Sequence, residues 1–285
     1  MRSRTVTQIL YPSIRQVPSY PSMVDPRVTR LFELLTGHST HLTADDKVLL
    51  HVFDMPEAIT AELVRVAQAT GAQVVTRLEQ NLVRRQVLHG MTEANAATIA
   101  DIELHEMEQM TAYIAVRGSY NYAELGDVPD DVMSMWQRVY ATPVIFGCRV
   151  PKTKWVVLRW PSPGMAQQAN MSTPAFEDFF FNVCTVDYKR MGEACKPLQD
   201  LMNKTDRVVI KGPGTDLSFS IKDIGSVPCA GEANIPDGEC FSCPTPDSMN
   251  GTIQYNTVSL YQGTEFKDIY FRVKDGVIVE ATAGS

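Results

Sequence analysis

The residues best placed to do chemistry lie in one stretch of the chain, from Gly212 to Thr252. Glycines and prolines alternate there with single acids, and these residues fix tight turns because glycine reaches positive φ and proline locks φ. Glu239 follows a Pro-Asp-Gly turn and precedes the β-prone pair Cys240-Phe241. The pattern therefore predicts that the Glu239 carboxylate sits at the mouth of a strand, where functional side chains are often placed.

Other residues in the same stretch have patterns that are less specific for chemistry. Asp216, in Gly-Pro-Gly-Thr-Asp, is predicted to brace a turn rather than to bind a metal ion. The sequence Gly212-Pro213-Gly214 could form a phosphate-binding loop, but its proline lacks a backbone donor and no Lys-Ser or Lys-Thr pair follows. Cys240 and Cys243 match Cys-x-x-Cys without a second ligand pair, which favours ordinary thiols.

All five histidines lie in the first part of the chain, and none of them has HExxH spacing. No set of Cys, Asp or Glu near them would complete a metal site, so we predict none there. His51 is expected within a strand. The other four are expected at the surface: His38, His41, His89 and His105.

Two separated motifs resemble the M29 metallo-aminopeptidases, the thermophilic aminopeptidase family. One is Gly-Pro-Gly-Thr-Asp-Leu, from Gly212, followed by Asn-x-Pro-x-Gly-Glu-x-Phe-x-x-Pro, from Asn234. The other lies upstream and consists of Trp160-Pro-Ser-Pro, Ala-Gln-Gln-Ala-Asn-Met-Ser from Ala166, and Phe-Glu-Asp-Phe from Phe176. Two motifs in the correct order are more specific than either alone. The resemblance extends from about Val48 onward.

The resemblance implies a particular chemistry. Members of the family hold two divalent metal ions (Zn, Co or Mn) on carboxylates and histidines, and these ions polarise a peptide carbonyl and lower the pKa of a bridging water. Glu239 matches the family's first glutamate ligand. The other family ligands follow the equivalent of residues 279–283, so we expect the catalytic residues beyond Ser285 and expect this chain alone to be inactive. A single carboxylate does not hold two ions in a defined geometry.

The same resemblance predicts the reaction and the partners. The parent protein would release N-terminal amino acids from peptides, and a homodimer would enclose its active sites. The chain would then be either a fragment or a degenerate homologue. The alternative is a non-catalytic binding or interaction protein descended from an aminopeptidase. The missing ligands favour this alternative, whereas the presence of Glu239 opposes it.

The elements that must position these residues form two groups, of which the first alternates strands with helices. Strand, helix, glycine and strand over residues 47–78 form a βαβ unit, which requires a right-handed crossover and a parallel sheet. No Gly-x-Gly-x-x-Gly follows the first strand, so no dinucleotide site is predicted. The predicted strands are residues 47–53, 73–78, 113–116 and 155–160. The predicted helices are residues 56–70, 92–110, 130–140 and 188–203, with one more starting at Thr173.

Apolar residues at helical spacing indicate which side chains these helices bury. The helix over residues 56–70 is expected to bury Ile59, Leu63, Val66 and Ala67. The helix over residues 92–110 is expected to bury Ala96, Ile99, Ile102 and Met107. The helix from Thr173 is expected to bury Phe176, Phe179, Phe180 and Val183. The helix over residues 188–203 is expected to bury Met191, Ala194, Leu198 and Leu201.

After residue 203 the pattern changes to short alternating strands, predicted at residues 207–211, 217–221, 252–255 and 269–273. Asp275-Gly276 suits a type I′ hairpin turn. We therefore predict an α/β fold: an extended N-terminal arm (1–25), an α/β domain with a largely parallel sheet (26–203), and a mainly antiparallel β region (204–285). The family resemblance implies that this last region is the start of a metallopeptidase domain.

Composition limits the remaining function classes. The 285 residues contain 26 Lys and Arg against 33 Asp and Glu, and the net charge of -7 argues against a nucleic-acid or anionic-membrane binder. No apolar run has bilayer-spanning length, and no apolar segment follows the basic residues of the N-terminus as in a signal peptide. The six cysteines are scattered, which is typical of reduced thiols, so we expect a cytoplasmic protein.

Overall fold

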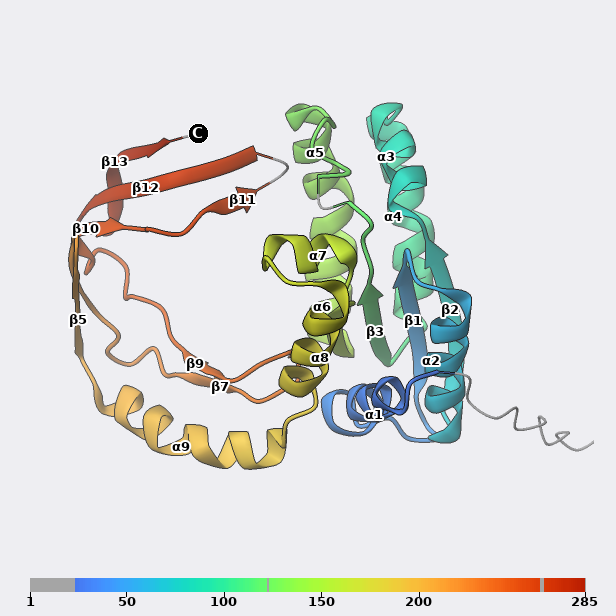
Figure 1. Ribbon diagram of the computed structural model, residues 1–285. Helices are drawn as coiled ribbons and strands as arrows, with labels where there is room; N and C mark the ends of the chain where they lie inside the picture. The colour runs from blue at the N-terminus through green and yellow to red at the C-terminus, as the bar shows by residue number, and fades with distance from the viewer. Residues whose placement is uncertain (1–23, 122, 262–263, 285) are drawn as a thin grey trace, which may run out of the picture.

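A computed structural model of the chain describes residues 24–121, 123–261 and 264–284. Nearly all of the predicted N-terminal arm lies outside the described residues. The chain forms a parallel sheet with helices, followed by an antiparallel sheet, as the sequence predicts (Figure 1). Within the described part of the chain, no helix is long and apolar enough to cross a membrane.

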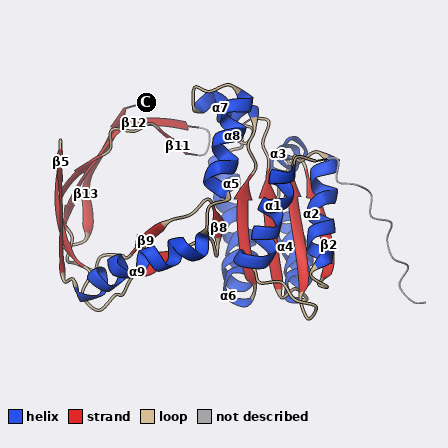
Figure 2. Ribbon diagram, turned by 60° about the horizontal axis from the view of Figure 1, so that its bottom comes forward, coloured by secondary structure: helices blue, strands red, loops and turns tan. Residues whose placement is uncertain are grey.

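The parallel sheet has five strands in the order β2-β1-β3-β4-β8. All of its pairings are parallel. The strands are β1 (Lys47–Phe53), β2 (Gln73–Glu79), β3 (Ala112–Arg117), β4 (Lys154–Arg159) and β8 (Asn234–Ile235). The first four confirm the predicted strands to within one residue at each end. Helices cover both faces of this sheet (Figure 2).

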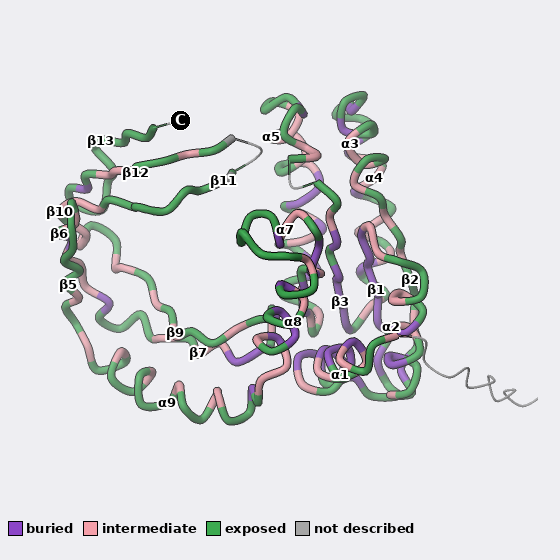
Figure 3. Tube along the Cα trace, viewed as in Figure 1, coloured by how far each residue is buried: buried purple, intermediate pink, exposed green. Residues whose placement is uncertain are grey.

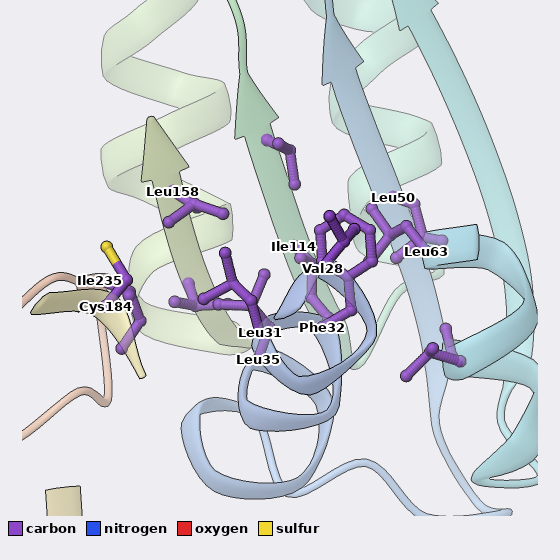
Figure 4. Packing of buried hydrophobic residues seen from close by; sticks show 14 of the residues in the cluster. Val28, Leu31, Phe32, Leu35, Leu50, Leu63, Ile114, Leu158, Cys184 and Ile235 are labelled. Carbon is purple, nitrogen blue, oxygen red and sulfur yellow. The ribbon is translucent and has the colours of Figure 1, made fainter. Parts of the chain in front are cut away.

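One face of the parallel sheet carries the main hydrophobic core. Successive side chains of a strand point to opposite faces, so alternate residues such as Leu50, Ile114 and Leu158 lie on this face, where they are fully buried. The helices that cover them are α1 (Pro26–Leu34), α2 (Glu57–Ala69) and α8 (Thr173–Cys184) (Figure 4). A short π-helical segment (Leu35–Ser39) continues α1.

Helix α1 was not among the predicted elements, although its sequence carries a start signal. Asp25 caps the helix by accepting a hydrogen bond from the backbone N–H of Arg27, and Pro26 occupies the first turn. The apolar stripe that it buries has helical spacing and consists of Val28, Leu31, Phe32 and Leu35. The helix therefore follows from its cap and its apolar stripe.

The opposite face of the sheet is covered by a second set of helices. These are α3 (Asn81–His89), α4 (Glu93–Glu108) and α5 (Asp130–Trp136), with the π-helical segment η2 (Gln137–Arg149) and the short α6 (Val150–Lys152). The expectation that α4 buries Ile102 is wrong, because that side chain is 62% exposed. The buried stripe of α4 consists of Ala96, Ala100 and Met107, which leaves Ile102 on the outer side of the helix.

Two further burial predictions are also wrong. Phe179 of α8 is 54% exposed, because the core takes Phe176, Phe180 and Phe181 instead. On α9 (Tyr188–Lys204), Ala194, Leu198 and Leu201 are exposed, and among the described residues only Tyr188 of this helix is buried. The reason is that α9 runs away from the parallel sheet toward the second sheet rather than along the core (Figure 1).

The second sheet is antiparallel and has six strands. These are β5 (Arg207–Gly212), β6 (Thr215–Ser220), β10 (Asn250–Gln254), β11 (Ser259–Tyr261), β12 (Thr264–Lys274) and β13 (Val277–Gly284). Asp275 and Gly276 both have positive φ, 48° and 77°, as the predicted type I′ turn between β12 and β13 requires. Burial is concentrated in the parallel sheet and its helices, and the antiparallel sheet is mostly exposed (Figure 3).

The carboxylate of Asp46 ties together the N-terminal ends of the central strands. It is buried and accepts hydrogen bonds from Thr43, Thr111 and Lys154, with Nζ of Lys154 at 2.7 Å. Burial by itself would raise the pKa of this carboxyl. The hydrogen bonds outweigh that effect and lower the pKa to about 2.

We expect the free energy of unfolding to depend on Asp46 in acid. The carboxyl has a pKa of 3.8 in the unfolded chain and about 2 in the folded protein. Its ionised form therefore stabilises the fold at pH values above 3.8, and this stabilisation is lost as the pH falls toward 2. Urea unfolding should show that Asp46→Asn is less stable than the wild type near neutral pH, by an amount that shrinks between about pH 4 and pH 2. The exposed neighbour Asp45, changed to Asn, is the matched control. A constant difference across this range would contradict the assignment.

Candidate metal-ligand site

The turn that precedes Glu239 is held in shape by its own polar side chains. Asn234 Nδ2 donates to the carbonyl of Pro236 at 2.8 Å. Asp237 accepts from the backbone N–H groups of Gly231 at 2.8 Å and of Gly238 at 3.0 Å. Gly238 has φ of +138°, a conformation that side chains rarely adopt. The sequence Asn-Ile-Pro-Asp-Gly therefore delivers the next residue, Glu239, in a defined place.

Glu239 begins the short strand β9 (Glu239–Phe241), as its sequence context predicts. This strand pairs antiparallel with β7 (Val227–Cys229), and Glu239 lies opposite Cys229. The side chain is exposed. Burial, followed by the charges of Asp237, Glu239 and Glu232, raises the pKa of the Cys229 thiol. The region around Glu239 is therefore negatively charged, which suits a cation.

Glu239 also lines a shallow cavity that is wide open to solvent. Its volume is about 410 Å³, and its lining includes Asn234, Pro236, Asp237 and Gly238. Val183 of α8 forms the remaining wall. Strand β8 explains this arrangement, because its pairing with β4 brings Asn234 to the edge of the parallel sheet, close to α8.

A second, mostly apolar cavity adjoins the first. Its volume is about 340 Å³, and it shares Val183, Asn234 and Pro236 with the cavity of Glu239. Its walls include the aromatic side chains of α8, namely Phe176, Phe179 and Phe180. The aromatic run of α8 therefore has two roles, since it packs against the sheet and lines an apolar chamber beside the carboxylate.

The described residues do not complete a metal site around Glu239. No group of three His, Cys, Asp or Glu side chains is placed to hold a metal ion in residues 24–121, 123–261 and 264–284. His51 is a buried strand residue, as predicted. His38 is half-buried rather than at the surface, because its Nε2 lies 2.7 Å from the carbonyl of Ala230 and its ring stacks on Tyr188. The residues present therefore supply one ligand, which does not fit a pair of ions.

The other residues that the sequence singles out have structural roles. Asp216 forms an exposed ion pair with Lys211, its partner across β5 and β6. Gly212-Pro213-Gly214 forms the turn between these strands and leads into β6, which excludes a strand–loop–helix phosphate site. Gly214 has φ of +70°, and an added Cβ there would collide with Gln254.

All six cysteines are free, as expected for ordinary thiols. Cys240 does not pair with Cys243. Its thiol instead lies 3.6 Å from the carbonyl oxygen of Cys195 on α9, and Cys243 is exposed. Burial and the neighbouring Cys240 raise the pKa of Cys195, which lowers its thiolate content.

Sequence reasoning did not identify the two cavities beside Glu239. They form where α8, β4 and the segment from Asn234 meet, and these segments are far apart in the chain. The upstream motif from Phe176 was the available clue, because it supplies the aromatic wall.

Comparison with known proteins agrees with this architecture. A family model described as thermophilic metalloprotease (M29) matches residues 24–285. The structure is similar to wild-type AmpT from Thermus thermophilus, with a TM-score of 0.74 at 18% identity over 90% of this chain and 71% of that one. It is also similar to a 2,5-dihydroxypyridine dioxygenase from Pseudomonas putida KT2440, with a TM-score of 0.50 at 13% identity over 90% of this chain and 68% of that one. At these identities the likeness shows the fold alone. No curated protein sequence matches the chain.

Proposed function

Because the chain belongs to the M29 family of thermophilic metalloproteases, we propose that it is the N-terminal part of a metal-dependent aminopeptidase. Its substrates would be peptides, and the reaction would release the N-terminal amino acid. Glu239 would be one ligand of a pair of divalent ions, with Zn, Co and Mn as the candidate metals. The remaining ligands and the catalytic residues would come from residues that follow Ser285.

One observation carries this proposal. The exposed Glu239 carboxylate stands at the end of a rigid turn, in a negatively charged region, on the wall of a cavity. A metal ligand must be pre-positioned in this way, since the metal fixes the distance and direction of each donor atom. Because the described residues supply a single ligand, we draw no catalytic step through the metal.

The apolar cavity beside Glu239 gives the proposal a substrate preference. An aminopeptidase must hold the side chain of the N-terminal residue close to its metal ions. The chamber lined by Phe176, Phe179 and Phe180 opens beside the cavity of Glu239 and has room for a large apolar side chain. We therefore propose a preference for N-terminal leucine or phenylalanine over alanine.

Val183 lies between the two cavities and allows a test of this preference. In the product of the uninterrupted reading frame, hereafter the longer product, Val183→Phe should lower kcat/KM for leucine p-nitroanilide about tenfold relative to alanine p-nitroanilide. The larger ring would occupy the space for the leucine side chain. Asn182→Phe is the matched control, because Asn182 is the exposed neighbour on the same helix. An unchanged leucine-to-alanine ratio would rule out this chamber as the side-chain pocket.

The function itself is tested by assaying aminoacyl p-nitroanilides with added Zn²⁺, Co²⁺ or Mn²⁺. The longer product should cleave leucine p-nitroanilide but not the N-acetylated compound, and the 285-residue chain should be inert. Cleavage of the blocked compound would indicate an endopeptidase instead. If the reading frame ends at Ser285, and the chain neither binds metal nor cleaves these substrates, the enzyme proposal fails.

A second candidate is a non-catalytic binding or interaction protein. The single ligand among the described residues favours it. Under this alternative, the cavities beside Glu239 would still bind peptides. Added metal ions would not change the affinity for the peptide, and the peptide would not be cleaved. Intact peptide recovered after incubation of the longer product with each metal would support this alternative over the aminopeptidase.

We also propose that the protein is cytoplasmic and forms a homodimer. The antiparallel sheet offers a surface for contact with a second copy of the chain. Its strand β13 carries three apolar side chains that are about half exposed or more, namely Val277, Ile278 and Val279. Light scattering of the longer product should give the mass of two chains. A monomer at micromolar concentration would contradict the dimer.

A further inference from the structure

The parallel sheet has a cavity at the position where α/β sheets commonly bind ligands. Strands β2 and β3 pair with opposite edges of β1, so the strand order reverses direction beside β1. In α/β sheets, ligands commonly bind at such a topological switch point, at the carboxyl ends of the strands. A cavity of about 430 Å³ lies at this place, on the face covered by α3, α4 and η2. His51 and Phe53 of β1 and Arg117 of β3 line it.

The walls of this cavity suit a flat apolar molecule. They carry six apolar side chains from β2, α3, α4, α5 and η2, namely Leu78, Val83, Val87, Ile99, Trp136 and Ile145. Trp136 is stacked on Tyr140, with ring centroids 4.1 Å apart, so its indole has a fixed orientation. Val83 is 56% exposed and lies where the cavity meets solvent.

Three arginines in the lining give the cavity a cationic side. Their guanidinium groups lie against aromatic rings, because Arg84 and Arg117 are 5.9 and 5.7 Å from the Phe53 ring centroid and Arg149 is 3.9 Å from that of Tyr113. None of the three forms an ion pair with a carboxylate among the described residues.

The two carboxylates in the lining already have other partners. Glu79 Oε1 lies 2.8 Å from His51 Nε2. Glu103 pairs with Arg77 at 2.5 Å and accepts a hydrogen bond from Tyr140 at 2.5 Å. The three guanidinium groups of the lining therefore outnumber its two carboxylates, which leaves the cavity with an excess of positive charge.

Arg149 is the buried member of this cationic set. The residue is only 5% exposed, and its Nε, which is covered by protein, has no hydrogen-bond partner among the described residues. An unpaired buried charge destabilises the fold, so an anion held in the cavity beside this guanidinium would offset part of that cost. Carboxylate and phosphate oxygens are the acceptors that a guanidinium binds most strongly.

A smaller cavity extends the cationic side. Its volume is about 230 Å³, and it shares Phe53, Arg84 and Arg117 with the first. Arg159 and Ser162 add further polar groups to its lining. The charged end of a ligand would therefore lie toward Arg84 and Arg117, and its apolar body would lie toward Trp136.

We propose that this cavity binds a small aromatic carboxylate, with its ring among the apolar walls and its carboxylate facing Arg84, Arg117 and Arg149. The main cavity shares none of its lining residues with the cavities beside Glu239, whereas Arg159 of the smaller cavity also lines the apolar chamber there. It therefore does not depend on the proposed peptidase function.

Calorimetric titration of the chain with 2-naphthoate in metal-free buffer tests the proposal. We expect binding with a submillimolar Kd, and at least about tenfold weaker binding of 2-naphthamide, which has the same shape without the charge. Arg84→Gln should weaken naphthoate binding at least about tenfold. Arg138→Gln should leave it unchanged, because Arg138 lies on η2 but outside the cavity and pairs with Glu93 at the surface.

A second variant covers the case in which loss of an arginine disturbs the fold. Val83→Trp places a bulky ring at the exposed edge of the cavity and should block naphthoate without lowering the melting temperature. Equal affinity for the acid and the amide would overturn the proposal, as would no binding at millimolar concentration. If inorganic phosphate binds more tightly than naphthoate, the cavity is a simple anion site and the aromatic-carboxylate proposal is wrong.

Discussion

In the longer product, Glu239→Gln is expected to lower kcat/KM for leucine p-nitroanilide by at least about 100-fold. Glutamine keeps the size of the side chain but removes the negative charge that a divalent ion needs from its ligand. Mutation of a residue that only orients a metal ligand typically lowers metal affinity or activity by about 10- to 100-fold. Loss of a ligand itself should therefore lower activity further. Kinetics at saturating Zn²⁺, Co²⁺ and Mn²⁺ would measure the effect.

The substitution should leave the fold intact, because Glu239 is exposed and the side chains of Asn234 and Asp237 make the hydrogen bonds that hold the turn. Glu193→Gln is the matched control, since Glu193 is an exposed glutamate that pairs with Lys196 on the surface of α9. The control should keep wild-type kinetics. If Glu239→Gln also retains more than about half of the activity, the carboxylate is not a metal ligand.

Phe32→Ala is expected to lower the free energy of unfolding by about 3–5 kcal/mol. Phe32 is 0% exposed at the centre of the main core, where α1 crosses the parallel sheet, and its ring lies 6.0 Å from that of Trp160 (Figure 4). Truncation removes the transfer free energy of the ring and leaves a cavity that the surrounding strands cannot fill. Urea unfolding followed by circular dichroism would measure the loss.

Phe146→Ala provides the comparison for this experiment. Phe146 is 59% exposed on η2, so its truncation should change the free energy of unfolding by about 0.5 kcal/mol or less. A loss of under about 1 kcal/mol for Phe32→Ala would mean that α1 contributes little to the core.

The strands of the parallel sheet were predictable because burial on both faces leaves a strong sequence pattern. The strand Lys47–Phe53 has six consecutive buried residues, and its apolar run identified it with the same bounds as the structure. The hairpin at Asp275 was equally predictable, since its turn type needs positive φ at two positions and the Asp-Gly pair provides it. These features depend on local chemistry alone.

Which face of a helix is buried was less predictable, because burial depends on what lies next to the helix. The apolar residues of α9 have helical spacing, yet Leu198 and Leu201 are exposed where the helix leaves the core. Ile102 has the spacing of a core residue but lies outside the stripe that α4 buries. Hydrophobic periodicity predicts that a helix forms, but it does not predict which element packs against each of its faces.

The candidate site was predictable for one residue. Glu239 was identified from its turn and from a motif, whereas the chamber beside it depends on contact between α8 and a strand about fifty residues further along the chain. The short strand β8 makes that contact. A two-residue strand has no periodic pattern, so sequence reasoning could not place it.

Metal content after equilibrium dialysis tests the central claim most directly. The longer product should retain two divalent ions per chain, and Glu239→Gln should retain fewer than one, whereas Glu193→Gln should match the wild type. The 285-residue chain should retain none. Equal metal content in the wild type and in Glu239→Gln would contradict the assignment of Glu239 as a ligand, and a longer product free of metal would contradict the metallopeptidase account.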